Sequence, residues 1–154
     1  MRCRGSLRSR SGNTDGSVVV GGRKQATQRK RNTVSNIKDS LTKIMNLDGA
    51  LGTCVVDSNS GMMLGSDGGA GPINLEVAAA GNTEVVRAKR KTMKALNLKD
   101  TIEDILITLH GQYHLIRPLV SNDALFIYLV LDKTRGNLAM ARHQLAAIEK
   151  DMVI

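Results

Sequence analysis

The stretch from Ile73 to Leu96 limits the possible folds more than any other part of the sequence. It contains no proline and a single glycine, Gly81, so its roughly 24 residues predict one helix about 36 Å long. At about 100° per residue, its apolar and small side chains cover an arc of about 200°, roughly twice the stripe that a surface helix needs to pack on one sheet. We therefore expect this helix to need a second packing partner as well as a sheet.

A second copy of the chain is the expected partner, because the sequence predicts no further helix that could cover this side. The outer part of the arc contains Val77, Gly81, Val85 and Ala88, and the small residues among them permit close approach. The alternative is a cover formed by the chain's own loops. We predict a homodimer whose interface includes these four residues, and we expect Val85→Asp to break it.

Hydrophobic periodicity predicts the elements on both sides of the long helix. A first helix begins near a capping Asn36, and a last helix begins near Thr134. Between them lie five runs of strand-forming residues, separated by turn signals. The runs are 51–56, 62–64, 102–109, 113–119 and 124–131. The predicted fold class is therefore α+β, with one five-stranded antiparallel sheet and helices on both of its faces.

The run from Ile102 to Leu109 is expected at an edge of the sheet. It is apolar, and only Glu103 and Asp104 protect it from pairing with another strand. We therefore expect this strand to pair with its own copy. Ile105 and Ile107 complete the predicted dimer interface.

The basic charge of the sequence is concentrated near its N-terminus. Residues 1–34 contain nine Lys or Arg and one acid, Asp15, whereas residues 35–154 contain thirteen of each sign. We interpret residues 1–35 as a disordered basic tail and residues 36–154 as one domain. Nucleic-acid binding through this tail is an alternative function. Because periodic structure begins soon after Val34, we also expect a translation start there, which the intact mass of the native protein tests.

Few residues suggest catalysis or metal binding. The Gly-rich stretch 65–71, expected as a loop, lacks the Lys-Ser/Thr pair of a phosphate-binding loop. No Cys or paired carboxylate completes a metal site with His110, His114 or His143, and Cys54 lies in an apolar run, as a small buried side chain does. We predict no enzyme activity, cofactor or metal. No apolar run approaches the roughly 18 residues of a membrane helix, so a cytoplasmic protein is expected.

Four stretches together resemble a known family. They are NIKDSLTKIMNLDGALG, LEVAAAGNTEVVRAK, IEDILITLHGQYHLIRPL and LFIYLVLDKTRGNLAMARHQL, at residues 36–52, 75–89, 102–119 and 125–145. Their order is similar to that of the Roadblock/dynein light-chain family, in its bacterial branch. The resemblance implies a long helix on one sheet face, two helices on the other, and dimers formed through the long helix and third strand. It also implies a non-catalytic platform, such as a scaffold, a motor light chain or a bacterial regulator of Ras-like GTPases.

A basic face lies opposite the apolar arc in the second half of the long helix. We interpret Arg87, Arg90, Lys91 and Lys94 as a partner-binding patch for an acidic surface, with a solvated helix face as the alternative. Together with the resemblance, this patch predicts a homodimeric scaffold or regulator of a small Ras-like GTPase. Charge reversal at Arg90 and Lys94 should then slow GTPase association. A passive light-chain-type subunit that clamps a peptide would not respond to that change.

Overall fold

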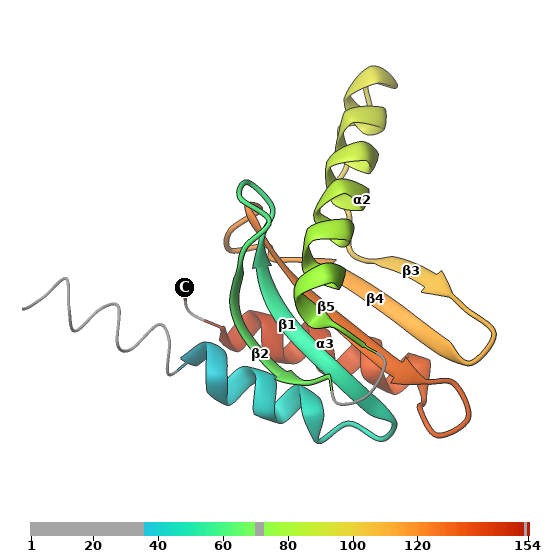
Figure 1. Ribbon diagram of the computed structural model, residues 1–154. Coiled ribbons are helices and arrows are strands. Elements are labelled where there is room, and N and C mark those ends of the chain that lie inside the picture. Colours follow the sequence, from blue (N-terminus) through green and yellow to red (C-terminus); the bar gives the residue numbers. More distant parts are fainter. Residues whose placement is uncertain (1–35, 70–72, 153) are drawn as a thin grey trace, which may run out of the picture.

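A five-stranded antiparallel sheet forms the centre of this computed structural model, which describes residues 36–69, 73–152 and 154 (Figure 1). The strands lie in the order β2-β1-β5-β4-β3, and each neighbouring pair is antiparallel. This confirms the predicted fold class. The strands are β1 (Ala50–Asp57), β2 (Met63–Gly68), β3 (Ile105–Thr108), β4 (Gln112–Pro118) and β5 (Leu125–Asp132). The predicted tail, residues 1–35, lies outside the described residues.

Helices cover both faces of the sheet (Figure 1). Helix α2 (Leu75–Ala95) crosses one face, whereas α3 (Leu138–Asp151) and the helical residues 36–45 lie on the other. A separate apolar cluster fills each layer between helix and sheet. The layer arrangement implied by the family resemblance is therefore confirmed. None of the helices in the described ranges has the length and apolar character needed to cross a membrane.

Strand β5 is the middle strand, and its residues from Leu125 to Leu131 are all buried. Successive side chains of a strand point to opposite faces. Phe126 and Tyr128 therefore join the apolar cluster under α2, while Ile127 and Leu129 join the cluster under the other helices. The uninterrupted apolar run of this strand thus reflects helices on both sides of the sheet.

The ends of two helices differ from the prediction. Helix α3 begins at Leu138 and not near Thr134. One carboxylate oxygen of Asp132 accepts hydrogen bonds from the backbone N–H and hydroxyl of Thr134, at 2.8 Å and 2.6 Å, which holds this segment in a turn. Asn137 then caps the helix through the Met140 N–H. In the first helix, Asn36 is itself helical, so it is not the cap we predicted.

Strand β2 extends further than its short apolar run predicted. It continues through Gly68, so most of the Gly-rich stretch that we expected as a loop belongs to the sheet. A Cβ atom at Gly65 would lie only 3.0 Å from Ile37 and 3.2 Å from Leu41. Glycine here allows the first helix to pack closely on β2. Residues 70–72 of the predicted loop lie outside the described residues.

Strand β3 is shorter than predicted, and proline explains why. Ile105 is paired with Ile116 of β4, so continued pairing would bring residue 103 opposite Pro118. Proline has no N–H group to donate to the ladder. The chain before β3 instead turns toward α3, where Arg142 donates to Asp104 at 2.9 Å. Strand β3 nevertheless occupies the edge of the sheet, as expected.

Candidate functional site

The outer face of α2 is the largest predicted interface surface, and the sheet leaves it uncovered. Leu75, Ala79 and Val86 occupy one half of the apolar arc, and they are buried against the sheet. In the other half, Val77 is 69% exposed, and Gly81 and Ala88 are also exposed. The wide apolar arc therefore has one side packed in the core and one side in solvent.

Val85 lies between these two sides. It is half-buried and packs against the apolar cluster under α2. A charge at this position would therefore disturb the core as well as any dimer. For this reason, the expected loss of the dimer in Val85→Asp would not by itself locate the interface.

Gly81 lies in the middle of α2 without an intramolecular reason for glycine. A Cβ atom at this position would meet nothing within 4 Å. Glycine within a helix costs about 0.5 to 1 kcal/mol relative to alanine. No contact within the described part of the chain requires glycine here. Close packing of a second molecule against the helix would require it, because a side chain at this position would keep the two apart.

The second half of α2 extends beyond the sheet (Figure 1). Leu96 belongs to the same sector of the apolar arc as the buried Val86, but it is 63% exposed, and Leu98 just after the helix is 52% exposed. Met93 is half-buried. The helical pattern thus predicted the wide apolar arc of α2 but not the place where the sheet beneath the helix ends.

The two predicted interface residues of the edge strand lie on the same side of the sheet as α2. Ile105 and Ile107 are half-buried and pack against the apolar cluster under the helix. An uncovered helix face and an unpaired strand edge therefore occur on one side of the molecule. Their role in a dimer stays a prediction.

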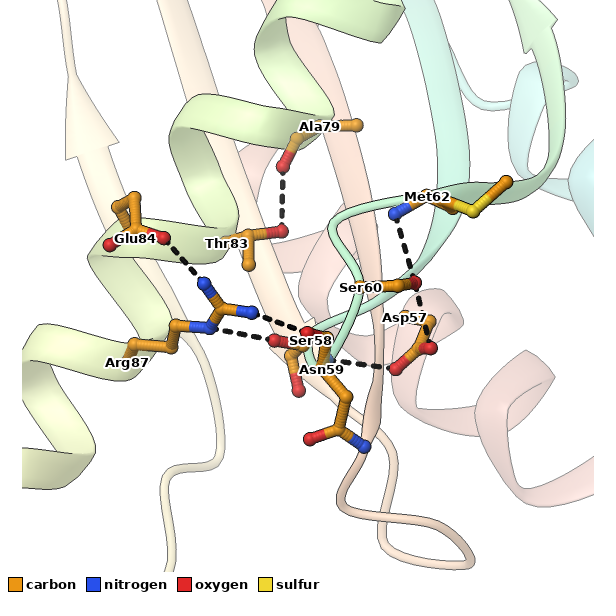
Figure 2. A network of polar contacts seen from close by, with 9 residues as sticks. All are labelled: Asp57, Ser58, Asn59, Ser60, Met62, Ala79, Thr83, Glu84 and Arg87. Atoms are coloured by element: carbon orange, nitrogen blue, oxygen red, sulfur yellow. Dashed lines mark hydrogen bonds and ion pairs between the residues drawn. The ribbon is translucent and has the colours of Figure 1, made fainter.

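Arg87, which we predicted as a partner-binding residue, holds α2 to the turn between β1 and β2 (Figure 2). Its Nε–H donates to the Ser58 carbonyl at 2.9 Å, and Nη2 donates to the Asn59 carbonyl at 2.5 Å. Nη1 pairs with Glu84, one helical turn earlier, at 2.7 Å. All three nitrogens of the guanidinium group are therefore engaged within the chain.

The turn that receives Arg87 is itself held by hydrogen bonds (Figure 2). The Asp57 carboxylate accepts from the Asn59 N–H and the Ser60 hydroxyl, both at 2.8 Å. These bonds hold the pKa of the Asp57 carboxyl below its usual value, with the Asn59 N–H as the largest cause. Gly61 closes the turn at a φ of +77°, which favours glycine.

Arg90 makes a second connection of the same kind. Its Nη1 donates to the Ser58 hydroxyl at 3.2 Å, and Nη2 donates to the Asp123 carbonyl in the turn between β4 and β5. By contrast, Lys91 and Lys94 are exposed. The predicted basic patch therefore has two arginines bound within the chain and two lysines that point to solvent.

The three histidines that were considered as metal ligands do not come together. His110 is exposed at the β3–β4 turn, and His143 is exposed on α3. His114 is half-buried beneath α2, where its Nδ1 lies 2.8 Å from the Tyr128 hydroxyl. Among the described residues, no cluster of three His, Cys, Asp or Glu side chains could hold a metal. Sequence reasoning missed the contact between His114 and Tyr128, because they come from different strands.

Comparison of this architecture with solved structures identifies the fold. No family model matches the sequence, and no curated protein shows significant sequence similarity. The structure is similar to a Roadblock/LC7 domain from Streptomyces avermitilis, with a TM-score of 0.61 and 8% identity over 76% of this chain and 91% of the other. This chain has the Roadblock/LC7 fold.

Two structures of MglB show the same Roadblock fold. MglB from Myxococcus xanthus has a TM-score of 0.69 and 14% identity, covering 77% of this chain and 86% of that one. The gliding protein MglB from Thermus thermophilus has a TM-score of 0.61 and 16% identity, covering 77% and 92%. At these identities, the similarity shows a shared fold.

An open groove of about 1030 Å³ lies beside the projecting half of α2. Its lining includes Met93 and Lys94 of α2, Val120 after β4 and His143 of α3. Val120 is 87% exposed. Sequence periodicity did not predict this groove.

Cys54 is fully buried in the layer under α2, as predicted for a small apolar side chain. Burial raises the pKa of its thiol to about 12, so thiolate is scarce near neutral pH. We expect iodoacetamide at about pH 8 to leave Cys54 unmodified in the folded protein and to label it in denaturant. Peptide mapping by mass spectrometry measures this, and rapid labelling of the folded protein would contradict the structure.

Proposed function

We propose that this chain is a non-enzymatic platform that forms a homodimer and regulates a small Ras-like GTPase. The observation that carries the proposal is the uncovered apolar face of α2 beside the edge strand β3. The Roadblock fold is consistent with it, and the family resemblance of the sequence implies the same class of function. Enzyme activity is not required, because a regulator can act through binding alone.

The dimer half of the proposal follows from surface chemistry. Val77 and Gly81 present apolar and small groups to solvent, and burial of apolar surface favours association by roughly 25 cal/mol per Å² before the costs of binding. Strand β3 has unpaired backbone groups on its outer side, which a second β3 would satisfy. One structure of similar fold is described as MglB with a tetrameric arrangement, so self-association occurs in that relative. Light scattering that finds only monomer at micromolar concentration would rule out the proposed homodimer.

The partner half rests on the basic surface of α2. A dimer would present two copies of Lys91 and Lys94, which are exposed. Arg87 and Arg90 are bound within the chain, so we propose that they position the helix, while the lysines meet an acidic surface of the partner. The regulator would act by binding one conformation of the GTPase's mobile loops more tightly than another.

Substitution of the two lysines tests the proposed binding of the GTPase directly. In the double variant Lys91→Glu/Lys94→Glu, we expect the association rate with the GTPase to fall about tenfold at low salt, because charges at the rim mainly set the on-rate. Stopped-flow binding measures the effect. Reversal of Lys43 and Lys133, which are exposed outside α2, is the matched control. Equal losses in the two double variants would mean that only net charge matters.

A passive peptide-binding subunit is the second candidate, because the groove beside α2 offers space for a peptide. Its apolar lining includes Met93 and Val120. In that case, replacing Val120 by Asp should abolish peptide binding, while the lysine reversals should have little effect on it. The two candidates therefore respond to different variants.

A further inference from the structure

The far end of α2 carries two exposed leucines. The helix extends past the sheet, and the chain turns back at its end (Figure 1). Leu96 ends the helix and Leu98 follows it, and each keeps more than half of its surface in solvent. Burial of apolar surface is favourable, so this end of the molecule is suited to contact with an apolar partner.

Hydrogen bonds fix the shape of this end. The Asn97 N–H donates to the Lys94 carbonyl at 3.1 Å, and the Leu98 N–H donates to the Met93 carbonyl at 3.0 Å. Asn97 lies in the left-handed region, with a φ of +53°. This pattern is the Schellman ending of a helix, in which asparagine can take the place of glycine. The two leucines are therefore held on a defined turn.

Lysines flank the leucines along the chain. Residues 85–99 contain six Lys or Arg and no acid. Arg87 and Arg90 donate to carbonyls of the two adjacent turns, which leaves the lysines. The acid that follows, Asp100, accepts a hydrogen bond from the Thr101 N–H. We call residues 89–99 the basic tip, and its exposed cations are Lys89, Lys91, Lys94 and Lys99.

We propose that the basic tip docks on an anionic lipid surface. Lysine ammonium groups bind anionic headgroups, and leucines placed between them can enter the adjoining hydrocarbon. The aliphatic stems of the lysines lie in the same boundary while their charges stay in water. One kind of surface therefore accounts for both the charge and the apolar side chains of the tip.

Other anionic partners account for the charge only. Nucleic-acid phosphates would bind the lysines, but residues 89–99 contain no aromatic side chain on which a base could stack. An acidic protein would also bind the lysines, and in the proposed function the GTPase uses Lys91 and Lys94. Neither kind of partner gives a role to Leu96 and Leu98. A lipid surface does, because it offers hydrocarbon directly beneath its charges.

The lipid contact goes beyond the proposed function and depends on neither the dimer nor the GTPase. It adds a place of action, the surface of a membrane. Substitution of Leu96 and Leu98 leaves every lysine unchanged, so an effect on lipid binding can be separated from an effect on the GTPase. A chain that binds lipid but no GTPase would contradict the proposed function alone.

Co-sedimentation of the full chain with lipid vesicles tests the contact. We expect binding to vesicles of phosphatidylglycerol and phosphatidylcholine, and none to vesicles of phosphatidylcholine alone. Leu96→Ser/Leu98→Ser should lower the partition onto the anionic vesicles by about tenfold or more, because serine gains nothing from entering hydrocarbon. The matched control, Met62→Ser/Met140→Ser, removes two exposed apolar side chains from other parts of the surface. It should bind as the unmodified chain does.

A single tryptophan tests whether the tip enters the bilayer. The chain contains no tryptophan, so Leu96→Trp reports on this position alone. Its emission should shift to shorter wavelength on the anionic vesicles. The emission of Met140→Trp, on α3, should stay unchanged.

Any of four results would overturn the lipid contact. The unmodified chain could fail to bind the anionic vesicles. Leu96→Ser/Leu98→Ser could bind them equally well, which would show that charge alone acts, as it would on nucleic acid. The emission of Leu96→Trp could remain unshifted on vesicles that carry the protein. Finally, Leu96→Ser/Leu98→Ser could change the oligomeric state in ultracentrifugation, which would mean that a second copy covers the leucines.

Discussion

Val77→Asp is expected to convert the protein into a folded monomer. Val77 is 69% exposed in the single chain, so the substitution removes no core contact. An aspartate near the N-terminus of α2 is also compatible with the helix dipole. Enclosing that carboxylate in an apolar interface costs several kcal/mol, so we expect the dissociation constant of the dimer to rise by about 100-fold or more.

Analytical ultracentrifugation measures this change, and Ala80→Asp is its matched control. Ala80 is exposed on the same helix but lies outside the predicted apolar arc, so its variant should remain dimeric. Thermal unfolding should show that both variants are folded. If Val77→Asp dimerised as tightly as the unmodified chain, the outer face of α2 would not be the interface.

Arg87→Ala is expected to have the largest effect on stability among changes at exposed charged residues of α2. Its guanidinium group bonds to the Ser58 and Asn59 carbonyls and holds α2 to the β1–β2 turn. Hydrogen bonds that involve a charged group contribute about 1.5 to 3 kcal/mol. We therefore expect a loss of about 2 kcal/mol, which lowers Tm by roughly 8 °C for a domain of this size.

Differential scanning calorimetry of three variants separates this structural role from a role in partner binding. Arg87→Lys keeps the charge but cannot reach both carbonyls with a planar fork, so its Tm should also fall. Lys91→Ala, on the exposed side of the same helix, should change stability by less than about 0.5 kcal/mol. A Tm of Arg87→Ala equal to that of the unmodified protein would mean that these hydrogen bonds contribute little.

The sequence predicted most of the fold because its elements are separated by clear turn signals. The alternation of helical and strand periods identified all five strands and the three helices. The errors occurred where distant residues decide the outcome. Pro118 of the neighbouring strand β4 limits the length of β3. Gly65 of β2 leaves room for the first helix to pack closely on the strand. Neither effect is visible in the local pattern of the affected segment.

The candidate site was predictable only in part, for the same physical reason. Periodicity placed Val77 and Val86 in different sectors of the apolar arc of α2, and in the structure the first is exposed and the second is buried. It could not show that Arg87 and Arg90 bond to Ser58, which lies 29 and 32 residues away. Both arginines occupy the solvent side of a helical wheel, yet the turns at the end of the sheet reach around to meet them. A helical wheel contains no information about such turns.

The nucleotide cycle of Ras-like GTPases from the same organism gives the most direct test of the proposed regulatory function. Each GTPase is titrated with the purified chain, and nucleotide hydrolysis and exchange are followed. We expect one GTPase to change its rate with a saturating dependence on the chain, and Lys91→Glu/Lys94→Glu to shift that dependence to higher concentration. If no small GTPase of the organism changes either rate at saturating concentration, the regulatory function is contradicted.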